Sequence, residues 1–152
     1  MQIRIITVTN KINQPHKQLI EDYCKRIGPK WKIQWRLVAG GRGDKQRALA
    51  EEAEAISRLL KPGDNIWLLD ETGEQLDNVQ LAKKFEFAER SGSDLVFIIG
   101  GSYGVDEKIK AVCHTKWSLS PLVFPHQIVQ ILLSEQIYRT QSILAGHPYH
   151  HA

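Results

Sequence analysis

Residues 95–104 read Leu-Val-Phe-Ile-Ile-Gly-Gly-Ser-Tyr-Gly, an apolar run that passes directly into a glycine-rich turn. Every position from 95 to 99 is apolar, which is typical of a strand in a parallel sheet that helices cover on both faces. The run is the longest apolar one in the chain, and it is far shorter than the roughly 20 residues that a membrane-spanning helix needs. The stretch therefore indicates an α/β fold and argues against a membrane protein.

The rest of the chain alternates strand-like and helix-like patterns on both sides of this run. Short β-branched apolar stretches are separated by longer segments in which apolar residues recur every three or four positions. This alternation predicts one α/β domain over residues 1–152, with a mostly parallel sheet and helices on both faces. The expected strands are residues 3–8, 32–38, 66–69, 95–99 and 115–118, and the expected helices are residues 15–27, 44–60, 77–90, 106–112 and 125–144.

The composition describes a globular protein without a disulfide framework. The chain has 152 residues, of which 42% are hydrophobic and 24% are charged. Its N-terminal segment lacks the cleavage pattern of a signal peptide, so we expect a cytoplasmic protein. Cys24 and Cys113 stand in neither a Cys-x-x-Cys motif nor a Cys/His metal spacing. We therefore expect free buried thiols and no metal site.

The basic residues are concentrated near the N-terminus. Residues 1–47 contain 11 basic against three acidic residues, a net charge of +8, whereas the remainder contains nine basic against 14 acidic, a net charge of −5. A one-sided basic segment is the usual footprint of a polyanion-binding protein. Charge alone leaves equal room for a second interpretation, in which these side chains only solvate exposed faces.

Three loops follow expected strands and are candidates for a ligand site, because open α/β sheets bind ligands beyond the carboxyl ends of their strands. They are residues 69–73, 99–104 and 118–126. The third loop holds two prolines and several apolar side chains, so we expect it to line an apolar pocket. Asp106 and Glu107 would repel a phosphate at the glycine turn, which favours a nucleoside without a pyrophosphate. Simple tight turns and a rigid cap on the core are the alternatives.

The last expected helix carries apolar residues around most of its circumference, whereas a helix that lies on a sheet shows one apolar stripe. We expect it to have two apolar neighbours, the sheet and either a second copy of the chain or more of the same monomer. Glu135 and Arg139 are expected to form a partly buried ion pair, unless Arg139 meets a phosphate. The tail from His147 is either frayed or positioned to stack on a base and move a proton.

Five linked motifs resemble those of one family. They are L-[DE]-x-x-G from Leu69, F-I-I-G-G-x-x-G from Phe97, S-L-S-x-x-x-x-P-H from Ser118, E-Q-x-Y-R from Glu135 and P-Y-H from Pro148. Their order and spacing are similar to the bacterial ribosomal RNA large-subunit methyltransferase H family of the SPOUT superfamily. The resemblance implies a C-terminal trefoil knot, a homodimer formed through the last helix, and metal-free methyl transfer from S-adenosylmethionine to N3 of a pseudouridine in 23S ribosomal RNA.

The resemblance also implies roles for individual residues. The substrate-side residues would be Arg139, Tyr149 and His150, acting near the methyl donor that the partner subunit binds. The donor itself would lie against Leu69, Gly100, Leu119, Ser120, Pro121, Leu122, Val123 and Phe124. The ribosomal RNA would contact Arg42, Lys45, Arg47 and His151.

His151 and Gln130 stand where the family commonly has basic residues, which predicts weaker RNA contact there. The main alternative function is a non-catalytic ribosome- or RNA-binding protein of the same fold. A different nucleotide-using α/β enzyme is a further alternative, which the missing P-loop and dinucleotide fingerprint disfavour.

Overall fold

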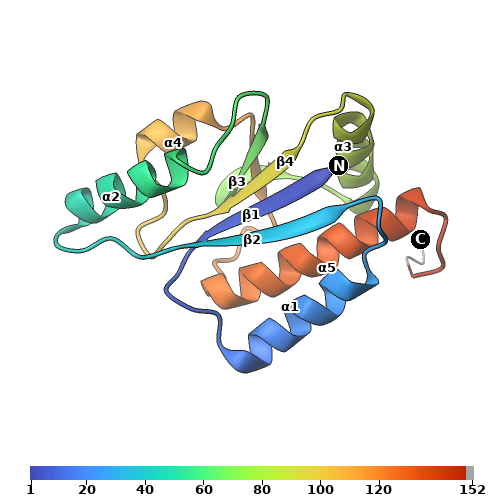
Figure 1. The fold of residues 1–152 in the computed structure, drawn as a ribbon, viewed down its shortest axis with the longest axis horizontal. Coiled ribbons are helices and arrows are strands. Elements are labelled where there is room, and N and C mark those ends of the chain that lie inside the picture. The colour runs from blue at the N-terminus through green and yellow to red at the C-terminus, as the bar shows by residue number, and fades with distance from the viewer. Residues whose placement is uncertain (150–152) are drawn as a thin grey trace.

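Strands and helices alternate throughout the computed structural model, which describes residues 1–149 (Figure 1). The pattern confirms the strand and helix order expected from the sequence, with most bounds within three residues. The strands are β1 (Gln2–Val8), β2 (Lys32–Val38), β3 (Asn65–Gln75), β4 (Leu95–Ile99) and β5 (Thr115–Ser118), and the helices are α1 (Gln14–Arg26), α2 (Lys45–Ser57), α3 (Asn78–Arg90), α4 (Glu107–Val112) and α5 (His126–Leu144).

The five strands form one sheet in the order β2-β1-β4-β3-β5, and every pair of neighbouring strands is parallel. The all-apolar strand β4 lies at the centre, where Leu95 is aligned with both Ile3 of β1 and Asn65 of β3. Because β4, β3 and β5 are adjacent and parallel, their carboxyl ends meet at the same edge of the sheet. The three loops that the sequence singled out are thereby brought together.

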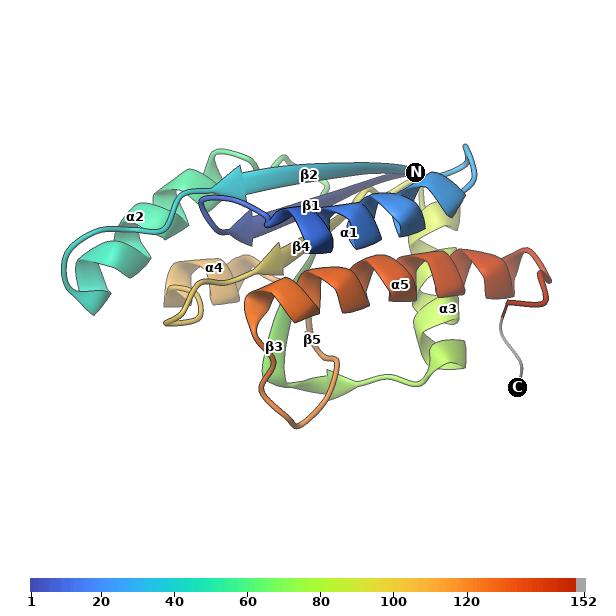
Figure 2. The ribbon, with the colours of Figure 1, turned by 90° about the horizontal axis from the view of Figure 1, so that it is seen from below.

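Helices cover both faces of the sheet, as expected (Figure 2). Successive side chains of a strand point to opposite faces, so Phe97 belongs to the core beneath α1, α3 and α5, whereas Val96 and Ile98 belong to the core beneath α2 and α4. Both faces of β4 are dry, which explains why the strand is apolar at every position. An aromatic cluster joins Trp67 and Trp117 beneath the site edge, with ring centroids 5.9 Å apart.

Strand β3 is longer than expected, which corrects the prediction that it ends at residue 69. Beyond Leu69 it continues to Gln75 through a bulge, and Trp117 of β5 is aligned with both Leu69 and Glu74. Gly73 allows this close pairing, because a Cβ there would lie 2.6 Å from the carbonyl oxygen of Lys116. The extension is polar and pairs only with the short edge strand, so no apolar pattern marks it.

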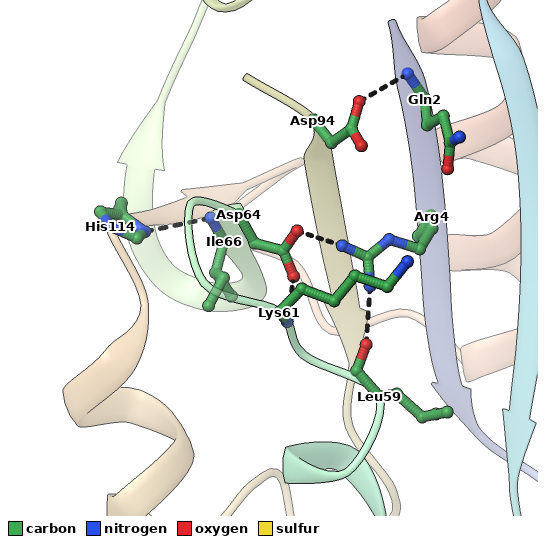
Figure 3. A network of polar contacts seen from close by, with 8 residues as sticks. All are labelled: Gln2, Arg4, Leu59, Lys61, Asp64, Ile66, Asp94 and His114. Atoms are coloured by element: carbon green, nitrogen blue, oxygen red, sulfur yellow. Dashed lines mark hydrogen bonds and ion pairs between the residues drawn. The ribbon is translucent and has the colours of Figure 1, made fainter. Parts of the chain in front are cut away.

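A buried polar network lies at the opposite, amino-terminal edge of the sheet (Figure 3). The guanidinium of Arg4 pairs with the carboxylate of Asp64 and donates to the carbonyl oxygen of Leu59 at 2.6 Å. The second oxygen of Asp64 accepts from the backbone N–H of Lys61 at 2.6 Å. Only 5% and 4% of the two paired side chains are exposed. The pair therefore fixes the entry to β3, far from the three loops.

Helix α5 lies over the sheet between α1 and α3, and these helices with the sheet bury Leu133 and Ile137. Much of its apolar circumference is thus covered by α1 and α3 of its own chain. Of the two alternatives for the neighbour other than the sheet, this is the one in which more of the same monomer covers the helix. Ile128 and Leu144, near its two ends, stay 37% exposed. Among residues 1–149, none of the helices is both long and apolar enough to cross a bilayer.

Both cysteines are free, as expected, but they are half-buried and not fully buried. Burial raises the pKa of the Cys113 thiol to about 11, and Lys116 opposes this shift only weakly. Burial also raises the pKa of Cys24. Both thiols are therefore protonated and weakly nucleophilic at neutral pH.

Candidate functional site

A cavity of about 630 Å³ opens at the carboxyl ends of β3, β4 and β5. Its size is that of a small-molecule site. Of the eight residues expected to bind the methyl donor, Pro121 does not line the cavity. The other seven do: Leu69, Gly100, Leu119, Ser120, Leu122, Val123 and Phe124.

The glycine turn after β4 forms one wall and is tightly built. Gly101 and Gly104 exchange backbone hydrogen bonds of 3.2 and 3.0 Å, and Gly104 has φ +76°, which favours glycine. A Cβ on Gly100 would lie 2.7 Å from the carbonyl oxygen of Gly104. Glycine is therefore required at position 100 for the turn to fold back on itself and expose its backbone to the cavity.

The loop between β5 and α5 forms the opposite wall. Two serines order it: the hydroxyl of Ser118 donates to the carbonyl oxygen of Ser120 at 2.9 Å, and the hydroxyl of Ser120 accepts from the N–H of Leu122 at 3.0 Å. Leu122 and Val123 are 69% and 78% exposed. The loop lines the cavity, as expected. It is partly buried, since Leu119 packs against the core, but it displays Leu122 and Val123. Such residues suit contact with a ligand or another chain.

Charged residues lie on the remaining rim. Burial opposes ionisation of Asp70, but hydrogen bonds from the hydroxyl and N–H of Thr72, helped by Lys116, lower its pKa overall. Asp70 is therefore a carboxylate at neutral pH. Lys110 and Lys116 also line the cavity, although sequence reasoning had not selected them. Their signal was weak, because each stands in a short element and belongs to no recognisable motif.

Arg139 and Tyr149 lie elsewhere, because Arg139 is in the C-terminal half of α5 and Tyr149 follows the helix, which ends at Leu144. Arg139 donates to one oxygen of Glu135 from Nε at 2.9 Å and from a terminal nitrogen at 2.5 Å, which confirms the predicted ion pair. The hydroxyl of Tyr149 donates to the same oxygen at 3.2 Å, and its ring lies 4.8 Å beneath the guanidinium. Arg139 and Tyr149 form one cluster on α5, and neither lines the cavity.

The electrostatics of this cluster fix its protonation. The hydrogen bond to Glu135 raises the pKa of Arg139. Burial, followed by the charge of Glu135 and the proximity of Tyr23, raises the pKa of Tyr149 to about 12. At neutral pH the cluster therefore holds the Arg139–Glu135 ion pair and a protonated phenol. His150 and His151 lie outside the described residues.

The separation between cluster and cavity is large. His126, which lines the cavity, begins α5, and Arg139 follows 13 residues later. With a rise of 1.5 Å per residue, about 20 Å of helix lies between them. Within one chain, the cavity and the Arg139 cluster do not form a single site.

The basic residues expected to contact RNA are exposed around the start of α2. Asp44 caps the helix by accepting from the N–H of Arg47 at 2.9 Å, and Glu51 accepts from Nε of Arg47 at 3.0 Å and from the N–H of Arg42 at 3.1 Å. Lys45 lines the cavity, so this basic segment adjoins it directly.

Gln130, in contrast, is 1% exposed, and its amide donates to the hydroxyl of Thr7 at 3.0 Å. In this chain, position 130 is therefore part of the core and offers no RNA contact. Across residues 1–149, no cluster of His, Cys, Asp and Glu side chains has the make-up of a metal site.

Comparison with known proteins agrees with this architecture. The family described as "Predicted SPOUT methyltransferase" matches residues 1–150. Proteins named ribosomal RNA large subunit methyltransferase H are similar along their whole length. The one from Nitrosomonas eutropha is 37% identical over 155 residues, covering 100% of both chains. Those from Ralstonia pickettii and Gloeobacter violaceus are 36% and 34% identical, each covering 99% of both chains. The chain therefore belongs to the SPOUT methyltransferase family and, within it, to the family of ribosomal RNA large subunit methyltransferases H.

Proposed function

We propose that the protein transfers a methyl group from S-adenosylmethionine to N3 of a pseudouridine in 23S ribosomal RNA. Family membership supports the methyl transfer and the ribosomal substrate. The observation that carries the proposal is the cavity in which seven of the eight expected donor-binding residues converge. We place the activity in the cytoplasm and assign it to residues 1–152 as one domain.

The cavity fits the methyl donor chemically. Its apolar walls, formed by Leu119 and the exposed Leu122 and Val123, suit an adenosine. The turn at Gly100 leaves backbone groups open to hydrogen-bond a purine edge. The ionised Asp70 suits a ligand that carries a positive sulfonium and ammonium. When bound, the donor supplies an electrophilic methyl group on a good leaving group.

We infer that the complete site needs two chains. The Arg139 cluster stands about 20 Å of helix away from its own cavity, so a partner subunit that packs against α5 is the simplest way to join them. The exposed apolar side chains of Ile128 on α5 and of Leu122 and Val123 on the preceding loop would supply this contact with apolar surface. We also propose that the segment of residues 118–126 belongs to a C-terminal trefoil knot.

In this arrangement the residues of the cluster act on the pseudouridine. N3 carries a proton at neutral pH, and this proton must leave before or during methyl transfer. The cationic Arg139 stabilises the negative charge that develops on the base or holds a phosphate. Tyr149, whose pKa of about 12 keeps it protonated, donates to Glu135 and so holds the Glu135–Arg139 pair in position beside the base. We assign proton removal to His150, because a neutral imidazole can accept the proton near pH 7.

The direct test is methylation of large ribosomal subunits that lack this modification. The purified protein is incubated with these subunits and S-adenosylmethionine, and the RNA is mapped by mass spectrometry. We expect one additional methyl group on a single pseudouridine of 23S RNA, and none with Gly100→Arg. Binding of the subunits and of the donor without any methylated nucleotide would instead identify a non-catalytic RNA-binding protein.

A further inference from the structure

Tyr103 stands out at the rim of the cavity because its large ring is 56% exposed although it belongs to a tightly hydrogen-bonded turn. It lies at the tip of the turn that Gly101 and Gly104 close with two backbone hydrogen bonds of 3.2 and 3.0 Å. The ring contributes little to the core, so folding alone does not explain it. A rigid exposed aromatic ring beside a cavity is suited to stacking on a flat ligand.

The ring is also held from the neighbouring helix. The ammonium of Lys45, at the start of α2, lies 5.9 Å from its centroid, within the range of a cation–π contact. Lys45 and Tyr103 are 58 positions apart in the sequence but line the same rim. They form a composite feature, a flat aromatic face next to a positive charge.

A buried carboxylate keeps this feature in place. Glu52 of α2 is 8% exposed and accepts from the N–H of Gly41 at 2.8 Å. Its oxygens also pack against the turn, since a Cβ on Gly101 would lie 3.3 Å from one of them. The loop before α2 and the turn after β4 are therefore fixed relative to each other, and the rim is preorganised.

The lysines around the rim determine what kind of flat ligand fits. Besides Lys45, the cavity is lined by Lys110 of α4 and Lys116 of β5, so positive charge comes from three separate elements. Lys110 is paired with Glu107 at 2.7 Å, and Lys116 lies 3.5 Å from the hydroxyl of Thr72. A base with phosphates on either side matches an aromatic ring with lysines around it.

We propose that Tyr103 stacks on an unpaired nucleotide of the RNA substrate at the mouth of the cavity, with Lys45 and Lys116 contacting the adjoining phosphates. This inference rests on the proposed function and adds to it a residue that selects and positions the RNA. The methyl donor is assigned to the interior, between Gly100 and the loop of residues 118–126. Tyr103, at the exposed rim, belongs to the RNA.

The test compares Tyr103→Ala with Tyr103→Phe, which keeps a stacking ring. The matched control is Phe87→Ala on α3, since Phe87 is 73% exposed and does not line the cavity. Binding of large ribosomal subunits, their KM and kcat in methylation, and binding of S-adenosylmethionine are measured for each. Alanine in place of a ring that stacks on a base should weaken subunit binding and raise KM by about 5- to 150-fold.

We expect Tyr103→Ala to show this loss with unchanged donor affinity, and Tyr103→Phe and Phe87→Ala to stay within twofold of the natural protein. Unchanged subunit binding in Tyr103→Ala would overturn the inference, as would a loss confined to donor binding, which would assign the ring to the adenine. If the natural protein binds subunits but does not methylate them, the proposed function fails, whereas a Tyr103→Ala binding defect would still support the stacking role.

Discussion

Substitution of Gly100 by alanine is the sharpest single perturbation of the donor cavity. The added Cβ would lie 2.7 Å from the carbonyl oxygen of Gly104, which is 0.7 Å inside the 3.4 Å at which ordinary contacts begin. It would also lie 2.8 Å from the carbonyl carbon of Gly104 and 2.9 Å from Cγ1 of Val105. The nearest obstacles are backbone atoms, so a side-chain rotation cannot relieve the overlap and the turn itself must move.

The cost follows from this geometry. Overpacking of this kind typically costs about 1–3 kcal/mol. The turn of the variant must shift to admit the Cβ, and donor binding requires the original position of the turn, so we expect part of the strain to oppose binding. One to three kcal/mol corresponds to a roughly 5- to 150-fold weaker Kd for S-adenosylmethionine. Thermal stability should fall as well, because the turn is packed against Val105 and, through Gly101, against Glu52.

The assay is isothermal titration of S-adenosylmethionine into both proteins, with a thermal melt of each. Gly28→Ala is the matched control, since its Cβ would lie 3.5 Å from Oε1 of Gln141, an ordinary contact outside the cavity. We expect the control to bind within twofold of the natural protein. An equally small change in Gly100→Ala would refute the assignment of this turn to the donor.

Three further predictions concern groups outside the cavity. Because burial raises the pKa of Cys113 from 9.0 to about 11, its thiolate fraction at pH 8 is about 100-fold lower than in the unfolded chain. Reaction of Cys24→Ser with a disulfide reagent should therefore be slow until denaturant is added, and rapid native labelling would contradict this. The raised pKa of Tyr149 contributes stability that is present below pH 10 and is lost as the pH rises through about 12. Absorbance at 295 nm should show one late tyrosine step that Tyr149→Phe removes, and a step that persists would assign it to another residue. Asp64→Ala strands the buried Arg4 and should lower the free energy of unfolding by about 3–5 kcal/mol, whereas a loss below about 1 kcal/mol in urea denaturation would show that the pair is dispensable.

Local sequence patterns predicted a helix or strand best where all of its faces have the same environment. Strand β4 was located to the residue because both of its faces are buried, and apolar side chains are then required at every position. The extension of β3 beyond Leu69 was missed because it depends on pairing with β5 across a bulge, and Gly73 is its only local sign. A turn residue can mark such pairing only once the partner strand is known.

In the candidate site, too, some parts could be predicted from local patterns and others depend on the tertiary structure. Parallel strands end at one edge of the sheet, so the three candidate loops could be selected from the alternation of strands and helices, whereas their assignment to the methyl donor came from the family resemblance. The position of Arg139 relative to the cavity could not be predicted from the sequence, because it depends on where the start of α5 is anchored and in which direction the helix runs. Likewise the contact between Lys45 and Tyr103 joins the start of α2 to the turn after β4, which only the folded sheet places side by side.

The most direct test of a site shared between two subunits is complementation between two inactive variants. Gly100→Arg removes the proposed donor cavity and Arg139→Ala removes the proposed substrate cluster, so each variant should be inactive when it assembles only with copies of itself. Co-expression with two different tags allows the mixed dimer to be purified and assayed on large ribosomal subunits. If the site joins the cavity of one chain to the Arg139 cluster of the other, the mixed dimer carries one intact site and should have about half of the natural activity. If each chain forms its own site, both sites of the mixed dimer are damaged, and the absence of any recovered methylation would contradict the account.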